Sequence, residues 1–241
     1  MEKYKERCSQ LGKIMTKART IKKDAVLAGD KLGETAKQRV QEAYLYNNFG
    51  IRNEINNKYL EKGTDCEDAS IDLFKQVTGM FAVKNKINFE NDFITGTPDI
   101  IKDNIVVDIK TSWSGATYPW FDTELTNKAY MYQLQGYMWL TGVKKAILAY
   151  CLTDANESLI QDEVRRTVWQ KKMIDPTEEQ LNKIEDDVRA QMTFGHVPSK
   201  LRVKMFEVNY DEKIIEEIKS RIELCGEYYN EISLVINNLK K

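Results

Sequence analysis

Histidine is almost absent from this chain of 241 residues, in which His196 stands alone. Acyl transfer by a Ser-His-Asp or Cys-His arrangement depends on a histidine base. His196 lies in "FGHVPSK", and the glycine and proline around it are typical of a loop. The sequence therefore offers little for catalysis based on histidine, and we interpret His196 as an ordinary loop residue.

Clustered cysteines and long apolar runs are also lacking. The four cysteines, Cys8, Cys66, Cys151 and Cys225, lie far apart and form no metal-binding spacing. We interpret them as reduced thiols, because a chain of this size seldom depends on a disulfide framework. There is no run of about 18 apolar residues, and the charged N-terminus has no apolar signal core. These features predict a cytoplasmic protein without a membrane segment.

A strong overall charge is missing too, since the net charge is only −1. The local balance is uneven, with eleven Lys/Arg against five Asp/Glu in residues 1–40, and ten acidic against six basic residues in residues 154–190. A basic segment is suited to approach nucleic acid, although a solvated helix surface explains the same pattern. Hydrophobic residues make up 42% of the chain and charged residues 30%, which indicates one globular domain with a core.

The hydrophobic pattern alternates between helical and strand periods. Residues 1–60 are expected to be mostly helical, and 154–200 to form a charged helical insertion. Between them we expect a helix at 63–79, a three-stranded meander within 80–112, a helix at 127–140 and a strand at 144–152. A strand at 201–210 and a long helix at 211–239 complete the chain. This order predicts an α/β fold, with a central mixed sheet flanked by helices.

Two carboxylates stand out within the apolar stretch "GTPDIIKDNIVVDIKTS" (96–112). If Asp103 and Asn104 form a two-residue turn, Asp99 faces Asp108 across the hairpin; a three-residue turn leaves them diagonal but close. Opposed Cβ atoms lie about 4.5–5.5 Å apart, so two anions there need a raised pKa or a cation between them. Carboxylates without nearby histidine or cysteine suit Mg²⁺ or Mn²⁺.

Lys110 is expected beside this pair. Strand alternation directs Asp108 and Lys110 to one face, and Val107 and Ile109 to the other face, into the core. A lysine in that place can orient a water molecule or stabilise negative charge on a phosphate. Carboxylates, a lysine and a divalent cation together are suited to the attack of water on a phosphodiester.

The residues Pro98-Asp99 and Asp108-x-Lys110 resemble the signature of the PD-(D/E)xK nuclease superfamily. This chain has aspartate where the family commonly has glutamate before x-Lys. The variant lies within the family pattern, but its shorter side chain could shift the metal.

Two further elements follow in the order of the family. Gly63-x-x-x-Glu67 is similar to the helical acidic motif of phage-type exonucleases (lambda exonuclease and YqaJ) and RecB-like nucleases, and Gln133-x-x-x-Tyr137 is similar to the Q-x-x-x-Y motif of the RecB-like branch. The resemblance covers roughly residues 60–150, together with the final strand and helix in outline, and implies a restriction-endonuclease-like core. It leaves residues 1–55 and 154–200 unexplained.

The resemblance also implies roles for individual residues. Asp99 and Asp108 would ligate Mg²⁺ with the carbonyl of Ile109, and Glu67 would join directly or through water. Lys110 would serve the attacking water.

The roles that the resemblance implies for Glu67, Gln133 and Tyr137 have alternatives. Thr64-x-x-Glu67 is also a capping box, in which the glutamate bonds back to the helix N-terminus. Gln133 and Tyr137 would orient the site or touch the DNA backbone, and their alternatives are a surface glutamine and a core tyrosine.

The loop that follows the lysine strand, "TSWSGATYPWF", is rich in aromatic residues. Thr111 and Ser112 are candidates for phosphate contacts, and Trp113 for base stacking, although local packing also explains the aromatic residues. Some RecB-like nucleases carry an Fe–S cluster on cysteines near the end of the chain. Cys225 alone does not supply such a set, so we predict no cluster.

The resulting hypothesis is a Mg²⁺-dependent DNA nuclease, most consistent with an exonuclease that acts on DNA ends in recombination or end processing. One alternative is a structure- or sequence-specific endonuclease with the same site. Another is an inactive DNA-binding or assembly protein of the same fold. The phage-exonuclease resemblance also implies a recombinase or single-strand annealing protein as a partner and a ring-shaped homo-oligomer.

Overall fold

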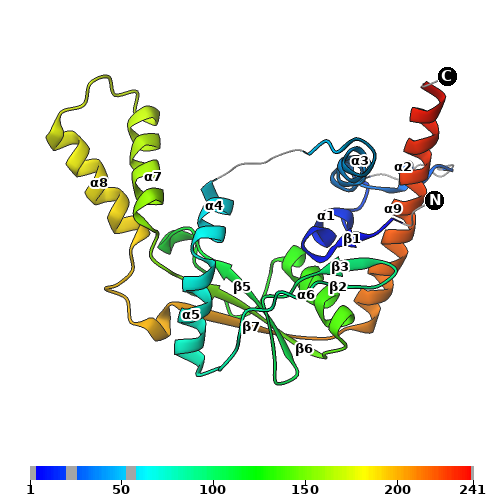
Figure 1. Ribbon diagram of the computed structural model, residues 1–241, viewed down its shortest axis with the longest axis horizontal. Coiled ribbons are helices and arrows are strands. Elements are labelled where there is room, and N and C mark those ends of the chain that lie inside the picture. The colour runs from blue at the N-terminus through cyan, green and yellow to red at the C-terminus, as the bar shows by residue number, and fades with distance from the viewer. Residues whose placement is uncertain (1–3, 20–25, 53–57, 240–241) are drawn as a thin grey trace.

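A four-stranded mixed sheet forms the centre of the molecule. The structure is a computed structural model and describes residues 4–19, 26–52 and 58–239 (Figure 1). The strand order is β4-β5-β6-β7, in which β5 and β6 are parallel and the outer pairs are antiparallel. The strands are β4 (Ile100–Lys102), β5 (Ile105–Thr111), β6 (Lys145–Cys151) and β7 (Val203–Asn209). The predicted central mixed sheet is confirmed.

The hairpin between β4 and β5 has the predicted two-residue turn. Asp103 and Asn104 have φ values of 51° and 62°, the left-handed region that aspartate and asparagine tolerate in tight hairpin turns. Ile100 pairs with Val107 and Lys102 with Ile105, so the predicted register is confirmed. Asp99 precedes the first of these pairs and therefore stands across from Asp108.

Helices cover both faces of the sheet. On one face, α6 (Lys128–Thr141) packs with α9 (Glu212–Leu239) and the N-terminal helices around a large apolar core that includes Val106 and Leu148. On the other face, α5 (Glu67–Thr78) packs against Val107 and Ile109. The helices that precede α5 in the chain are α1 (Leu11–Ile14), α2 (Ala28–Lys31), α3 (Glu34–Phe49) and α4 (Lys58–Asp65). Asp108 lies on the α6 face, opposite to Val107, as strand alternation predicts.

The predicted three-stranded meander is wrong. Residues 80–88, all described by the structure, contain no strand, and the stretch 92–101 is split between two sheets. Its first half forms β3 (Ile94–Gly96), which lies between β2 (Phe89–Glu90) and β1 (Glu6–Arg7) in a separate small sheet. Pro98 lies between the two halves, and a proline cannot donate a backbone hydrogen bond to a continuous ladder.

Most of the described residues up to 60 are helical, as predicted, but strand β1 was not predicted. The parallel pairing of β1 with β3 joins segments almost ninety residues apart. Strand β1 has only two residues, too few to show the alternation by which a strand is recognised in a sequence. The predictions for residues 1–3, 20–25 and 53–57 lie outside the described residues.

The predicted helical insertion forms a hairpin of α7 (Glu157–Gln170) and α8 (Glu178–Met192), which projects from the sheet on the side away from α3 and α9 (Figure 1). The two helices pack through a shared apolar face that includes Leu159, Ile160, Ile184 and Val188.

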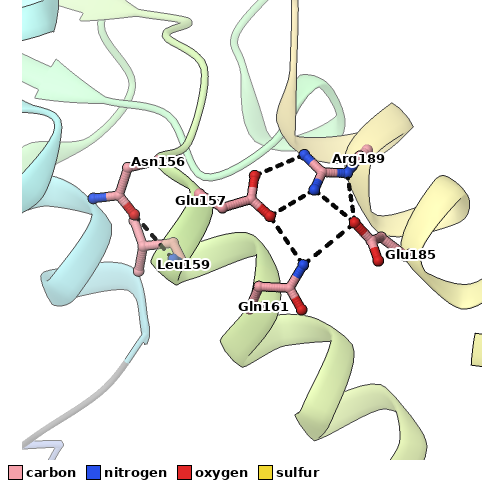
Figure 2. A network of polar contacts seen from close by, with 6 residues as sticks. All are labelled: Asn156, Glu157, Leu159, Gln161, Glu185 and Arg189. Carbon is pink, nitrogen blue, oxygen red and sulfur yellow. Dashed lines mark hydrogen bonds and ion pairs between the residues drawn. The ribbon is translucent and has the colours of Figure 1, made fainter.

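A polar network ties the bases of these two helices together (Figure 2). Arg189 on α8 donates to Glu157 Oε2 at 2.8 Å and to Glu185 Oε1, while Gln161 Nε2 donates to both glutamates. Asn156 caps α7 by accepting from the amide of Leu159 at 2.9 Å. Single exposed pairs contribute little, but a connected network restrains the angle between the helices.

The C-terminal helix α9 is confirmed and buries one stripe only along its first half. Ile215, Ile218, Ile222 and Cys225 are buried, and Ile214 is half-buried. Beyond Cys225 the helix runs beside α2 and α3, and Tyr228, Tyr229 and Ile232 pack, partly buried, against the same core. Within the described ranges, none of the helices has the length and apolar character needed to cross a membrane.

Candidate active site

A cleft of about 680 Å³ opens along β5, between the first turn of α5 and the face of α6. Strand β5 supplies the cleft with a continuous run of side chains, and α4 and the N-terminal segment contribute to its walls. Every residue predicted for the site lines this cleft: Glu67, Asp99, Asp108, Ile109, Lys110, Thr111, Ser112, Trp113, Gln133 and Tyr137. The fold thus brings together residues separated by up to 70 positions in the sequence.

Asp99 and Asp108 form the acidic centre of the cleft. The backbone amide of Ile109 donates to Asp99 Oδ2 at 2.6 Å, which fixes this carboxyl against β5. Burial and the neighbouring carboxylate of Asp108 raise the pKa of Asp99 to about 7. Asp108 itself is 2% exposed. Two carboxyl groups so close to one another and so poorly solvated attract a proton or a cation.

Lys110 lies beside Asp108, with Nζ 2.7 Å from Oδ2. Burial lowers the pKa of Lys110, but the attraction of Asp108 outweighs this effect and the net pKa is raised. Lys110 is therefore a cation at neutral pH. Its ammonium also lies 5.1 Å from the ring centroid of Tyr130, within the range of a cation–π interaction.

Gln133 holds Asp108 from the side of α6. Its Nε2 donates to Asp108 Oδ1 at 3.1 Å and to the hydroxyl of Tyr137 at 2.9 Å, and both side chains of α6 are buried. Gln133 and Tyr137 are four residues apart and therefore share one helix face. This excludes the surface alternative for Gln133 and gives Tyr137 a polar contact in addition to core packing.

Gly96 on β3 allows Tyr137 to take this position. A Cβ atom at Gly96 would lie 2.7 Å from Tyr137 Cε1 and 2.8 Å from Cys8 Sγ, distances too short for any side chain. The small sheet therefore supports the site through close packing against α6.

Glu67 lies at the start of α5 and turns toward Lys84, with Nζ 2.9 Å from Oε2. The alternative capping box is not formed, because Thr64 belongs to α4 and Cys66, which makes no side-chain cap, occupies the N-cap. Among the described residues, no group of three or more His, Cys, Asp or Glu side chains is arranged to hold a metal. Glu67 thus lines the cleft without joining the aspartate pair.

The end of β5 presents two hydroxyl groups of different character. Thr111 Oγ1 is engaged with Ser70 Oγ at 2.8 Å. Ser112 is 5% exposed, and its Oγ has no hydrogen-bond partner within the described part of the chain. A buried unpaired hydroxyl is costly, so Ser112 is the better placed of the two to bind a ligand oxygen.

The aromatic loop combines packing with exposure. Trp113 is half-buried against the α7–α8 hairpin, and Tyr118 is buried with Leu152. Trp120 donates from Nε1 to the carbonyl of Gly115, while Phe121 is 93% exposed. Local packing therefore accounts for most of these rings.

Lys62 on α4 is a buried cation that the sequence patterns did not identify. It is 1% exposed and donates from Nζ to the carbonyl of Trp113 at 2.9 Å. The same nitrogen lies 5.4 Å from the ring centroid of Phe194. Burial lowers the pKa of Lys62 to about 8. Nothing in its local sequence marks Lys62 as buried, because lysine is usually exposed.

Replacing Lys62 with methionine should stabilise the protein at pH 7 by about 1 kcal/mol, because removal of the buried charge outweighs loss of the bond to Trp113. The folded pKa lies below the unfolded value, so wild-type stability rises as the pH increases from about 8 to about 10.5. The advantage of Lys62→Met should therefore vanish near pH 10.5. Urea unfolding at both pH values measures the difference. The exposed Lys183→Met is the control, and a constant difference between variant and wild type would contradict the argument.

Several residues that line the cleft were not predicted from the sequence. Ser9 and Gln10 arrive from the N-terminal segment, and Tyr150 lies on β6 as the register partner of Lys110. Tyr130 could have been found, because it is three residues before Gln133 on the same helix face. His196 is exposed and does not line the cleft.

The donor set of the cleft fits a small hard cation. Asp108 Oδ2 is paired with Lys110 Nζ at 2.7 Å, and Asp99 is held close by with a raised pKa. Carboxylate oxygens without nitrogen or sulfur ligands suit Mg²⁺. Asp99, Asp108 and the carbonyl of Ile109 are the groups that would hold it.

Known structures share this architecture, although no family model and no curated protein sequence matches the chain. A phage-related exonuclease from Haemophilus somnus 129PT is 28% identical with a TM-score of 0.74, and the alignment covers 97% of each chain. The alkaline exonuclease LHK-Exo from Laribacter hongkongensis is 15% identical with a TM-score of 0.62, over 98% of this chain and 93% of that chain. LHK-Exo in complex with dAMP aligns with a TM-score of 0.63. The similarity to the phage-related exonuclease supports a nuclease. In its fold and in the order of its motifs, this chain is similar to the phage-type exonucleases of the PD-(D/E)xK superfamily.

Proposed function

We propose that this protein is a Mg²⁺-dependent exonuclease that hydrolyses DNA from its ends. The observation that carries the proposal is the acidic pair of Asp99 and Asp108, held next to the ammonium of Lys110 in an open cleft. The similarity to a phage-related exonuclease supports the exonuclease class. DNA as the substrate follows from that class.

The side chains of the cleft divide the work of hydrolysis. Gln133 and the Ile109 amide keep the two carboxylates in place, and the unpaired Ser112 hydroxyl is available to a phosphate oxygen. Because its pKa is raised, Lys110 acts as a cation rather than as a base: it orients water and stabilises the charge that builds on the phosphate. Bound Mg²⁺ would act as a Lewis acid and favour ionisation of water.

A digestion assay tests this function. The wild-type protein should degrade linear duplex DNA in the presence of Mg²⁺, leave covalently closed circles intact, and lose activity when EDTA is added. Asp108→Asn should reduce digestion at least about a hundredfold, because the carboxylate is both a metal ligand and the partner of Lys110. Nicked or linearised circles would instead favour the endonuclease alternative. Equal digestion by wild type and Asp108→Asn would refute the site.

The alternative of an inactive relative predicts DNA binding without digestion under all of these conditions. A role in recombination, an annealing protein or recombinase as partner, and a ring-shaped oligomer stay predictions from the resemblance.

A further inference from the structure

The segment 80–88, which connects α5 to the small sheet, reaches across to both acidic elements of the cleft. It was predicted to be a strand and contains none. Two adjacent residues, Lys84 and Asn85, make its polar contacts with the site. The segment therefore joins the start of α5 to the loop that carries Asp99.

Asn85 fixes this segment to the backbone around Asp99. Its amide donates to the carbonyl of Asp99 at 2.7 Å, and its Nδ2 donates to the carbonyl of Pro98 at 3.0 Å. The same side chain closes a local turn with Ile87 through both Nδ2 and Oδ1. Ala82, two residues before Lys84, is buried against the α5 side of the core. The backbone on either side of Lys84 is thus anchored.

Lys84 projects from this anchored backbone to Glu67. The distance from Nζ to Glu67 Oε2 is 2.9 Å, and a second contact to Asp68 Oδ1 measures 3.6 Å. About a third of each partner's side chain is exposed, 36% for Lys84 and 32% for Glu67. Partly exposed ion pairs are weak, so a divalent cation can displace the ammonium at small cost.

We propose that Lys84 is a tethered cation that occupies the Glu67 carboxylate and competes with a divalent metal for it. This inference rests on the proposed function, since it assumes that the acidic cleft binds metal. It explains why Glu67 lines the cleft beside Asp99 and Asp108 without forming one group with them. Lys84 then acts through Glu67 as a positioning residue, and it sets the metal affinity of the cleft.

Metal titration of the DNA-free protein tests the proposal. Isothermal titration calorimetry with Mg²⁺ alone and with Ca²⁺ alone compares wild type, Lys84→Met and Lys84→Arg. Lys84→Met should bind each metal about fivefold more tightly, because a nearby positive charge has been removed. Lys84→Arg, which keeps the charge, should bind like wild type. Lys75→Met is the matched control, since Lys75 pairs at 2.8 Å with Asp72, which is on the same helix as Glu67 but, unlike Glu67, does not line the cleft.

A double-mutant cycle separates competition from a general effect of charge. In a Glu67→Gln background, Lys84→Met should leave the metal affinity unchanged, because the shared carboxylate is gone. Unchanged or weaker binding by Lys84→Met in the wild-type background overturns the proposal, as does the same fivefold gain in the Glu67→Gln background.

This experiment distinguishes a wrong role for Lys84 from a wrong proposed function. Metal binding that depends on Asp108, shown by its loss in Asp108→Asn, with Lys84→Met identical to wild type, overturns the role of Lys84 alone. Absence of metal binding to wild type, or binding that survives Asp108→Asn, overturns both.

Discussion

Replacement of Lys110 with methionine should reduce phosphodiester hydrolysis by about a thousandfold, which corresponds to the loss of one well-placed charge in a sheltered site. Methionine fills a similar volume but cannot donate hydrogen bonds to water or to a phosphate oxygen. The loss of the lysine ammonium also leaves the buried Asp108 without its ion-pair partner at 2.7 Å. Single-turnover digestion of end-labelled linear DNA at saturating Mg²⁺ gives the rate of the chemical step.

Two further variants serve as controls for the Lys110→Met measurement. Lys102→Met removes a lysine from the neighbouring strand, where Lys102 is exposed and pairs with Asp103 at the turn, and should digest DNA like wild type. Lys110→Arg keeps the charge and should restore part of the rate, because the guanidinium is bulkier and its donors point elsewhere. If Lys110→Met retains more than about a tenth of the wild-type rate, the charge of Lys110 is not part of the chemical step.

The parts of the site that sequence reasoning could predict are those governed by local rules. The turn at Asp103 and Asn104 fixes the register of the hairpin, and strand alternation then assigns Asp108 to the α6 face. Helical spacing brings Gln133 and Tyr137 to the same surface. Each of these steps depends on residues less than ten positions apart.

The parts that could not be predicted depend on contacts between distant segments. The partner of β3 comes from Glu6–Arg7, and the partner of Lys62 is a backbone carbonyl at Trp113, 51 residues away. Lys84 looked like an ordinary strand residue because its partner, Glu67, is 17 positions earlier on a helix. Backbone carbonyls and single ion pairs leave no periodic trace in a sequence, so only the folded chain reveals them.

The electrostatic energy of the cleft depends both on locally determined residues and on contacts between distant segments. A cleft that brings together two poorly solvated carboxylates carries an electrostatic cost in the absence of metal, and the pKa of Asp99, raised to about 7, reflects this cost. The lysine at 110 relieves only part of this cost, because its ammonium pairs with Asp108 Oδ2 while the pKa of Asp99 stays raised. Function and stability should therefore oppose each other at Asp99.

Replacement of Asp99 with asparagine should stabilise the metal-free protein by about 2 kcal/mol at pH 8 while removing its activity. The asparagine carbonyl can still accept from the Ile109 amide, and its NH₂ group can donate to Asp108. The folded pKa of Asp99 lies above the unfolded value, so the folded state binds more protons between about pH 4 and pH 7. Wild-type stability should fall with rising pH across that window, and the full penalty should remain above pH 7.

Urea unfolding in EDTA between pH 4 and pH 8 tests this opposition directly. The advantage of Asp99→Asn should be absent near pH 4, grow up to pH 7 and then stay constant, since a neutral amide has no proton to lose. Asp103→Asn changes an exposed aspartate of the same hairpin at a position where asparagine tolerates the turn, and should follow wild type. Added Mg²⁺ should reverse the order at pH 8, because only wild type keeps both carboxylates that hold the cation. An Asp99→Asn protein that is less stable than wild type at pH 8 in EDTA would show that the aspartate pair is not under electrostatic strain, and the reason for placing a cation there would be lost.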